Sequence, residues 1–232
     1  MNILVCDDDR EIAKAVEIYL KKEGYGVIKA YDGEEALKAC SDNEIHLILM
    51  DIMMPKLDGI KATMKIREEK NIPIIMLSAK SEDGDKIIGL NVGADDYVTK
   101  PFNPLELVAR VKSQLRRYVH LGTMIKEEHE NGKIYKTGGV VMYDDEKKTV
   151  VDGEEISLTP IEYGILRLLM TEPGRVFSME EIYESVWGER AFNSENTIAV
   201  HIRRIREKIE IEPKDPRYLK VVWGIGYKVE KL

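Results

Sequence analysis

The chain has 232 residues, which is long enough for two domains of ordinary size. Its hydrophobic fraction of 44% and charged fraction of 33% indicate a folded globular protein and exclude a disordered chain. No apolar run approaches the ~20 residues of a membrane span. The first residues, MNILVCDDDR, also lack the basic region and cleavage site of a signal peptide. We therefore expect a cytoplasmic protein with no membrane contact.

The net charge of −7 is unevenly distributed. Residues 201–232 contain nine Lys and Arg against five Asp and Glu, whereas the rest of the chain is acidic. A local basic surface on an acidic protein is compatible with nucleic-acid binding. The two cysteines, Cys6 and Cys40, have no Cys or His at metal-ligand spacing, so we expect both to be buried and free.

The first half of the chain alternates strand and helix patterns. The runs NILVC, YGVIKA, HLILM, PIIMLS and DYVT predict five strands, each followed by a helix, the last of which begins at Pro104. Strands that alternate with helices indicate a doubly wound α/β domain, with a five-stranded parallel sheet and helices on both faces. We place this domain at residues 1–118.

The second half follows a polar stretch, which predicts a linker at residues 119–133. Beyond it, GGVVMYDDEKKTVVDGEEISLT predicts short strands with turns at DDEK and DG. Helices are predicted over residues 160–170, 178–187 and 194–211, and YLKVVWGIGYKVEK predicts a β-hairpin around a Gly-rich turn. Residues 134–232 are therefore predicted to form a separate α+β domain.

Polar residues stand at the carboxyl ends of the predicted parallel strands, where ligands of doubly wound sheets bind. Asp7 and Asp8 follow the first strand, Asp51 ends the third, and Ser78 and Lys100 end the fourth and fifth. Converging carboxylates repel one another unless a cation separates them, and Mg²⁺ favours such oxygen ligands. We expect Lys100 and Ser78 to hold the oxygens of a phosphoryl group on Asp51.

The motifs DDD, MDIMMPKLDG, LSAK and DDYVTKPF, in this order, resemble the receiver domain of two-component response regulators. The resemblance implies that Asp51 accepts a phosphoryl group from a sensor histidine kinase. It also implies that Lys100 pairs with that group, next to a cis Lys100–Pro101 peptide. The other implied residues are the Mg²⁺ ligands Asp8, Asp51 and the Met53 carbonyl, the pocket acid Asp7, and the switch residues Ser78 and Tyr97.

Four of the nine Lys and Arg of residues 201–232 lie in the stretch NSENTIAVHIRRIREKIE. Ile198, Ile202, Ile205 and Ile209 recur at helical spacing and predict one buried stripe. We expect the opposite surface to be exposed and to fit the major groove of DNA. Its residues are Asn196, Thr197, Val200, Arg203, Arg204 and Lys208.

The motifs LTPIEYGILRLL, VFSMEEIYESVWG, TIAVHIRRIREKIE and YLKVVWGIGYK resemble the winged helix-turn-helix effector domain of the OmpR/PhoB subfamily. Within it, the chain looks most like the VanR-type regulators of glycopeptide resistance. The resemblance implies a transcription regulator that binds double-stranded promoter DNA and works with RNA polymerase. The implied contacts are Asn196, Thr197, Ala199, Val200 and Arg204 near base edges, and His201, Arg203 and Arg206 near phosphates.

The predicted C-terminal hairpin corresponds to the wing of the subfamily's effector domain. It has Trp223 where many members carry an arginine. Trp223 cannot insert a cation into the minor groove, which is how an arginine would act there. Two alternatives stay open: Trp223 packs against the sugar edges of DNA, or it anchors the wing.

Family members pair their receivers after phosphorylation, through the face formed by the fourth helix, fifth strand and fifth helix. The resemblance therefore implies a homodimer held by crossed ion pairs. The implied pairs are Lys86 with Glu106, Asp96 with Arg110, and Asp95 with Lys112.

Two other functions fit parts of this pattern. A Mg²⁺-dependent phosphohydrolase with an aspartyl-phosphate intermediate needs an acid two residues after its nucleophile, and that position is Met53. A phosphorylation-independent DNA-binding or interaction protein would lack a pocket carboxylate or the lysine, and none is missing. We therefore expect a regulator that is not an enzyme.

Overall fold

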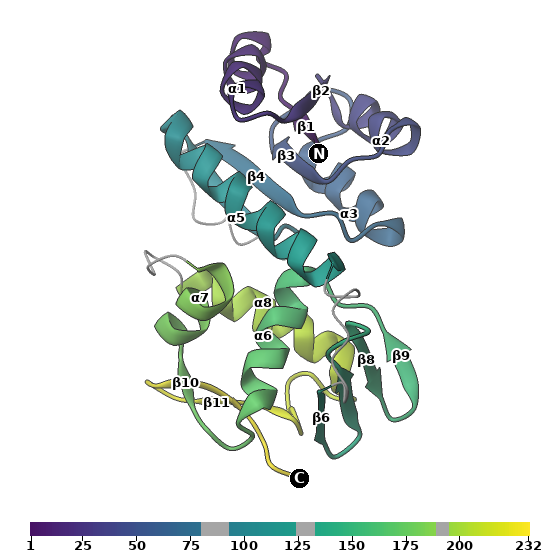
Figure 1. The fold of residues 1–232 in the computed structure, drawn as a ribbon, viewed down its shortest axis with the longest axis vertical. Coiled ribbons are helices and arrows are strands. Elements are labelled where there is room, and N and C mark those ends of the chain that lie inside the picture. Colours follow the sequence, from purple (N-terminus) through teal and green to yellow (C-terminus); the bar gives the residue numbers. More distant parts are fainter. Residues whose placement is uncertain (80–92, 124–132, 189–194) are drawn as a thin grey trace. The chain divides into compact units, whose positions relative to one another are not determined.

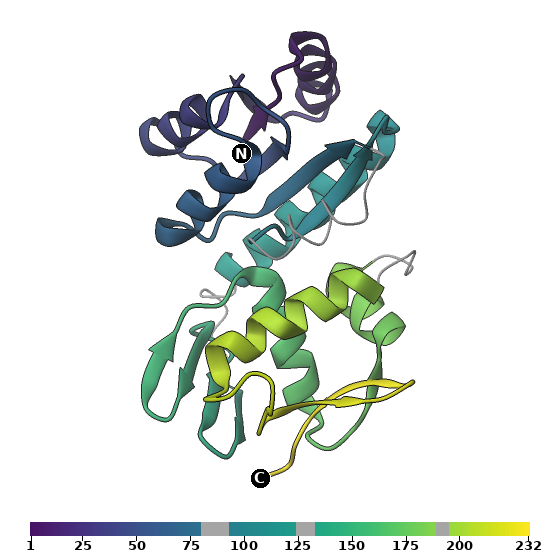
Figure 2. The ribbon, with the colours of Figure 1, turned by 180° about the vertical axis from the view of Figure 1, so that it is seen from behind.

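The computed structural model describes residues 1–79, 93–123, 133–188 and 195–232. The chain divides into two compact units, residues 1–118 and 119–232, and Figures 1 and 2 show their elements from opposite sides. Within the described ranges, no helix is both long and apolar enough to cross a membrane.

The first unit contains a five-stranded parallel sheet, which confirms the predicted doubly wound domain. Its strand order is β2-β1-β3-β4-β5, so the order reverses between β1 and β3. That point is where such sheets bind their ligands. The strands are β1 (Asn2–Cys6), β2 (Gly26–Ala30), β3 (Leu47–Asp51), β4 (Ile74–Ala79) and β5 (Asp96–Lys100).

Helices cover both faces of this sheet (Figure 1). On one face lie α1 (Arg10–Lys22) and α5 (Pro104–Thr123), and on the other lie α2 (Gly33–Asp42) and α3 (Gly59–Glu69). Asp9, Asp32 and Asp58 start α1, α2 and α3 as N-caps, because their side chains accept the first free backbone N–H groups. The helix predicted after β4 lies outside the described residues.

Alternate strand residues form the core beneath α1 and α5, in a cluster that includes Ile3, Val5, Leu47, Leu49, Ile75 and Leu77. Cys6 and Cys40 are buried and free, as predicted. Helix α5 continues to Thr123, into the segment that we predict as a linker, and residues 124–132 of that segment are not described.

In its described residues, the second unit combines two antiparallel sheets with three helices. One sheet contains β6 (Ile134–Thr137), β7 (Val140–Tyr143), β8 (Lys148–Val151) and β9 (Glu154–Ile156) in sequence order. The helices are α6 (Pro160–Thr171), α7 (Met179–Trp187) and α8 (Glu195–Ile209). The predicted hairpin is formed by β11 (Leu219–Val222) and β12 (Gly226–Val229), and β12 also pairs with β10 (Phe177–Ser178).

The predicted isoleucine stripe of α8 is confirmed, since all four side chains belong to the buried core of the second unit. Strands β6 and β10 were not predicted. Strand β10 has two residues, too few for any periodicity to appear in the sequence.

Candidate functional site

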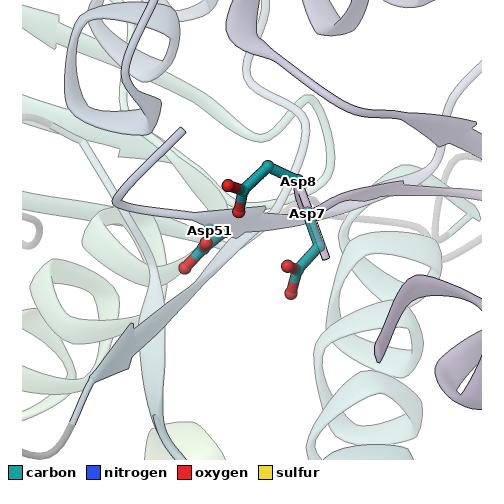
Figure 3. A group of neighbouring side chains, drawn as sticks. All are labelled: Asp7, Asp8 and Asp51. Carbon is teal, nitrogen blue, oxygen red and sulfur yellow. The ribbon is translucent and has the colours of Figure 1, made fainter. Parts of the chain in front are cut away.

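Three carboxylates meet at the carboxyl ends of β1 and β3 (Figure 3). Asp7 and Asp8 follow β1, Asp51 ends β3, and one oxygen from each lies within 4.8 Å of those of the other two. Asp7 and Asp51 are buried, whereas Asp8 is exposed. The structure thus brings together the three acids that the sequence predicts, and Asp8 leaves the cluster open to solvent.

Lys100, at the end of β5, reaches into this cluster. Its Nζ lies 2.7 Å from Asp7 Oδ2 and 3.1 Å from Asp51 Oδ1. Burial lowers the pKa of Lys100, but Asp7 and Asp51 outweigh this effect and raise the pKa above its ordinary value. Lys100 therefore stays charged beside Asp51. The Lys100–Pro101 peptide is cis, as predicted.

The cluster holds more negative charge than Lys100 can neutralise. Burial raises the pKa of Asp51 to about 6 despite Lys100, and the charge of Asp7 adds to the increase. Burial likewise raises the pKa of Asp7. A second cation would relieve this conflict. Hard oxygen donors with one solvent-facing side fit Mg²⁺, which retains part of its water shell.

The loop between β3 and α3 is fixed by contacts with the N-terminus of α2. Lys56 Nζ lies 2.6 Å from Asp32 Oδ2, and the Gly33 N–H donates to the Leu57 carbonyl at 2.9 Å. At the other end of the loop, a Cβ on Gly59 would lie 1.9 Å from the Asp51 carbonyl oxygen, so only glycine fits there. These contacts hold the loop that contains Met53.

The two predicted switch residues lie on neighbouring strands. Ser78 is 1% exposed near the end of β4, and its Oγ forms no hydrogen bond within the described part of the chain. Tyr97 is partly buried on β5 and is aligned with Met76 of β4. Their role as a switch remains a prediction.

The predicted DNA-facing surface of α8 is only partly exposed. Ala199 and Arg203 are exposed and Arg206 is half-buried. Three residues that were expected on the exposed surface are buried, so that expectation is wrong for Thr197, Val200 and Arg204. His201, predicted near a phosphate, is also buried. The reason is that α8 packs against both α6 and α7, which buries a wider arc than the isoleucine stripe alone. The Asn196 side chain is not described.

Arg204 is buried because Glu162 of α6 neutralises its charge. Glu162 has no exposed surface, and its carboxylate lies 2.9 Å from Arg204 Nη2 and 2.7 Å from Lys208 Nζ. It also accepts the Thr159 N–H at 2.9 Å, which completes the capping box of α6. Burial raises the pKa of Glu162, but Arg204 and Lys208 outweigh burial and hold it below its ordinary value.

Glu162 was not predicted as part of any site. Its spacing from Thr159 in LTPIE marks a helix N-terminus but does not reveal a distant arginine. His201 is buried for a different reason: its ring packs against Trp187, with ring centroids 5.6 Å apart.

Polar contacts join α8 to the hairpin β11–β12, which we call the wing. Glu210, directly after α8, accepts backbone N–H groups from Arg217, Tyr218 and Leu219 at 2.6, 2.9 and 2.8 Å. Arg206 Nε donates to the Leu219 carbonyl at 2.9 Å. Arg206, predicted near a phosphate, thus also holds the wing.

Trp223 lies at the tip of the wing and is 88% exposed. The alternative in which this side chain anchors the wing is therefore wrong. The side chain is available to contact another molecule.

Residues predicted to join two receivers form ion pairs within one chain. Arg110 lies 3.0 Å from Asp96 and 3.1 Å from Glu106. A dimer built on these residues would have to exchange ion pairs rather than add new ones. Lys86, the predicted partner of Glu106, lies outside the described residues.

The pair predicted between Asp95 of one receiver and Lys112 of another stays a prediction, and both residues have partners within the chain. Asp95 is 1% exposed, accepts the Ile74 N–H at 2.8 Å and pairs with Arg67 at 2.6 Å. Lys112 pairs instead with Glu23 of the same chain at 2.7 Å. To pair across two molecules, both residues would have to give up these contacts within the chain, as Asp96 and Arg110 would.

Two family models match the chain. The response regulator receiver domain matches residues 3–112, and the C-terminal domain of transcriptional regulatory proteins matches residues 153–229. The chain is 47% identical over 230 residues to the regulatory protein VanR of Enterococcus faecium, covering 99% of this chain and 98% of that protein. It is 44% identical over 229 residues to the regulatory protein VanRc of Enterococcus gallinarum, again covering 99% and 98%.

Two solved structures match nearly the whole chain. The response regulator DrrB of Thermotoga maritima, an OmpR/PhoB homolog, is 33% identical and has a TM-score of 0.51, covering 99% of this chain and 98% of that one. A RitR mutant is 25% identical with a TM-score of 0.75, covering 100% and 99% of the two chains.

Proposed function

This chain belongs to the two-component response regulators that join a receiver domain to a DNA-binding domain of the OmpR/PhoB type, and we propose that a phosphoryl group on Asp51 controls its binding to DNA. The observation that carries this proposal is the contact of Lys100 with both Asp7 and Asp51 inside a cluster of three carboxylates. This contact holds a cation beside the oxygen that would be phosphorylated.

In the proposed reaction, a sensor histidine kinase donates the phosphoryl group. An oxygen of Asp51 forms a bond to phosphorus while the bond from phosphorus to the kinase imidazole nitrogen breaks, and its electron pair stays on that nitrogen. Lys100 then exchanges its contact with the Asp51 carboxylate for one with a phosphoryl oxygen. Positioning and charge neutralisation of this kind account for most catalysis of phosphoryl transfer.

Receiver domains bind Mg²⁺ at acidic pockets of this kind. We propose that Asp8, Asp51 and the Met53 carbonyl hold the ion here, where it would neutralise charge on the transferred group. The buried Ser78 Oγ could then donate to a phosphoryl oxygen, and Tyr97 would move inward with it.

The second unit would bring Ala199 and Arg203 of α8, together with the wing, to double-stranded promoter DNA. RNA polymerase is the proposed partner at the promoter. Since two full-length relatives are VanR and VanRc, we propose that the target promoters control glycopeptide resistance genes. Mapping the bound sites across the genome, with and without phosphodonor, would identify them.

The phosphoacceptor is tested by Asp51→Asn in the full-length chain. This variant should lose Mg²⁺-dependent labelling by acetyl phosphate, and phosphodonor should no longer tighten its binding to DNA. Asp9→Asn is the matched control, because asparagine caps α1 as well as aspartate does and the position adjoins the pocket. Equal labelling of Asp51→Asn and the unaltered chain would refute the assignment.

A further inference from the structure

The tip of the wing presents three exposed apolar side chains. Val221, Trp223 and Ile225 are 37%, 88% and 58% exposed. The tip is a closed turn, because the Ile225 N–H donates to the Val222 carbonyl at 3.0 Å and Gly224 adopts a φ of +73°. Apolar side chains gathered on an exposed turn indicate a contact surface.

The wing is held at a fixed position relative to α8. The Glu210 carboxylate accepts three consecutive backbone N–H groups at the start of β11, and Arg206 donates to the first residue of that strand. In duplex DNA, a phosphate backbone separates each major groove from the minor groove beside it. An α8 bound to DNA would therefore carry the wing tip toward the neighbouring minor groove.

The charge around the tip favours DNA over a protein or lipid partner. Residues 219–229, which form the wing, contain no Asp or Glu, and Lys220 and Lys228 are aligned on its two strands. An apolar tip on a hairpin of positive charge complements the two phosphate backbones that border a minor groove.

We propose that Trp223 and Ile225 form an apolar wedge that enters the minor groove of duplex DNA and packs against sugars and base edges. The inference rests on the proposed DNA binding. Apolar wedges partly unstack a base step, and pyrimidine–purine steps are the easiest to deform. The wedge would therefore select sites with such a step beneath the wing. It would also supply affinity that does not depend on counterion release.

The test uses the full-length chain and a 40-base-pair duplex that the chain selects from random DNA. Trp223→Ala should weaken binding about tenfold, as expected for the loss of one apolar or stacking contact, without changing the slope of affinity against salt. Trp223→Arg should recover part of the affinity and steepen that slope by about 0.9, because it adds one phosphate-neutralising cation. Ile211→Ala is the matched control, since Ile211 is 94% exposed but lies outside the wing.

A second measurement reports on Trp223 directly. The chain has two tryptophans, and Trp187 is only 1% exposed, so acrylamide should quench Trp223 alone. The selected duplex should protect Trp223 from quenching by acrylamide. The Trp223→Ala variant gives the fluorescence and quenching of Trp187 alone.

The outcomes separate this inference from the proposed function. Unprotected Trp223 in the bound state, or unchanged affinity of Trp223→Ala, would overturn the wedge and leave DNA binding intact. Failure of the unaltered chain to bind any duplex would overturn both. If protection of Trp223 from acrylamide rises with protein concentration in the absence of DNA, the wing tip contacts a second copy of the chain. That result would overturn the wedge.

Discussion

Burial and the neighbouring carboxylates make the charged form of Asp51 unfavourable. Its folded-state pKa of about 6, against an ordinary value of 3.8, means that the folded receiver binds this proton more tightly than the unfolded chain does. The free energy of unfolding should therefore fall as the pH rises from about 4 through about 6. Without a phosphoryl group or a metal ion, the acidic site therefore lowers the free energy of unfolding.

Asp51→Asn should remove that cost. Without Mg²⁺ at pH 7, we expect the variant to have a higher free energy of unfolding by about 1–3 kcal/mol, following the size of the pKa increase. Calorimetry in EDTA would measure it, and the receiver transition is the one that Mg²⁺ shifts in the unaltered chain. A variant that is no more stable than the unaltered chain would contradict the electrostatic account.

Arg204 and Arg203 are adjacent in the sequence but differ in environment. Arg204 pairs with the buried Glu162, whereas Arg203 pairs on the surface with Glu207. Arg204→Ala should destabilise the second unit by about 3–5 kcal/mol, because it leaves a buried carboxylate without its main partner. Arg203→Ala should cost less than about 1 kcal/mol. Urea unfolding of both variants would check this difference.

The same ion pair predicts acid sensitivity. A carboxylate with a lowered folded-state pKa stabilises the fold above its unfolded pKa, and this stability is lost as the pH falls through the folded value. Arg204→Ala should therefore move the acid unfolding midpoint of the second unit to higher pH, followed by circular dichroism. Equal midpoints for Arg203→Ala and Arg204→Ala would show that Glu162 does not depend on Arg204.

At the scale of elements, the β3–α3 loop owes its shape to α2. Lys56 has a φ of +59°, a region that costs a residue with a Cβ about 1–2 kcal/mol. Its ion pair with Asp32 and the Gly33–Leu57 hydrogen bond hold it there. The loop contains Met53, so the strain lies within the segment proposed to bind the metal ion.

Two substitutions separate the ion pair from the strain. Lys56→Ala and Lys56→Gly both remove the pair with Asp32, but only glycine removes the strain. We expect Lys56→Ala to be less stable than Lys56→Gly by about 1 kcal/mol, and both to bind Mg²⁺ more weakly in calorimetric titration. Lys61→Ala, which removes an exposed pair with Asp58, is the control and should leave Mg²⁺ binding unchanged. Equal stability of the two Lys56 variants would contradict the claim that the positive φ at this position is strained for a residue with a Cβ.

At the scale of the whole molecule, receiver pairing remains a prediction, and the ion pairs within the chain affect how it can be tested. Because Asp96 and Arg110 already pair within one chain, a double charge reversal in that chain would restore the internal pair as well as any crossed pair. A mixture of two single variants avoids this ambiguity.

Asp96→Arg and Arg110→Asp should each fail to dimerise after treatment with phosphodonor, because like charges then face one another across the interface. An equal mixture should dimerise, since both crossed pairs are restored between unlike copies. The association should weaken with salt, because salt screens the attraction between the opposite charges of the crossed pairs. Sedimentation velocity measures all three samples, and a mixture that stays monomeric would refute this interface.

The sequence by itself determined the types of element, their order and the acidic site. Apolar runs and helical spacing are local properties, and the carboxyl ends of parallel strands meet at one edge whatever the details of packing. The strand pattern alone therefore places Asp7, Asp8, Asp51 and Lys100 together. The isoleucine stripe of α8 was predictable for the same reason.

Only the tertiary structure decided which polar side chains stay available for binding. Periodicity locates the apolar stripe of α8, but Arg204 is buried because Glu162, 42 residues earlier in the chain, lies against it. Asp95 and the loop at Lys56 likewise depend on Arg67 and Asp32. A charged group leaves water only where an opposite charge compensates its desolvation. That partner comes from another element, so no local pattern in the sequence can reveal it.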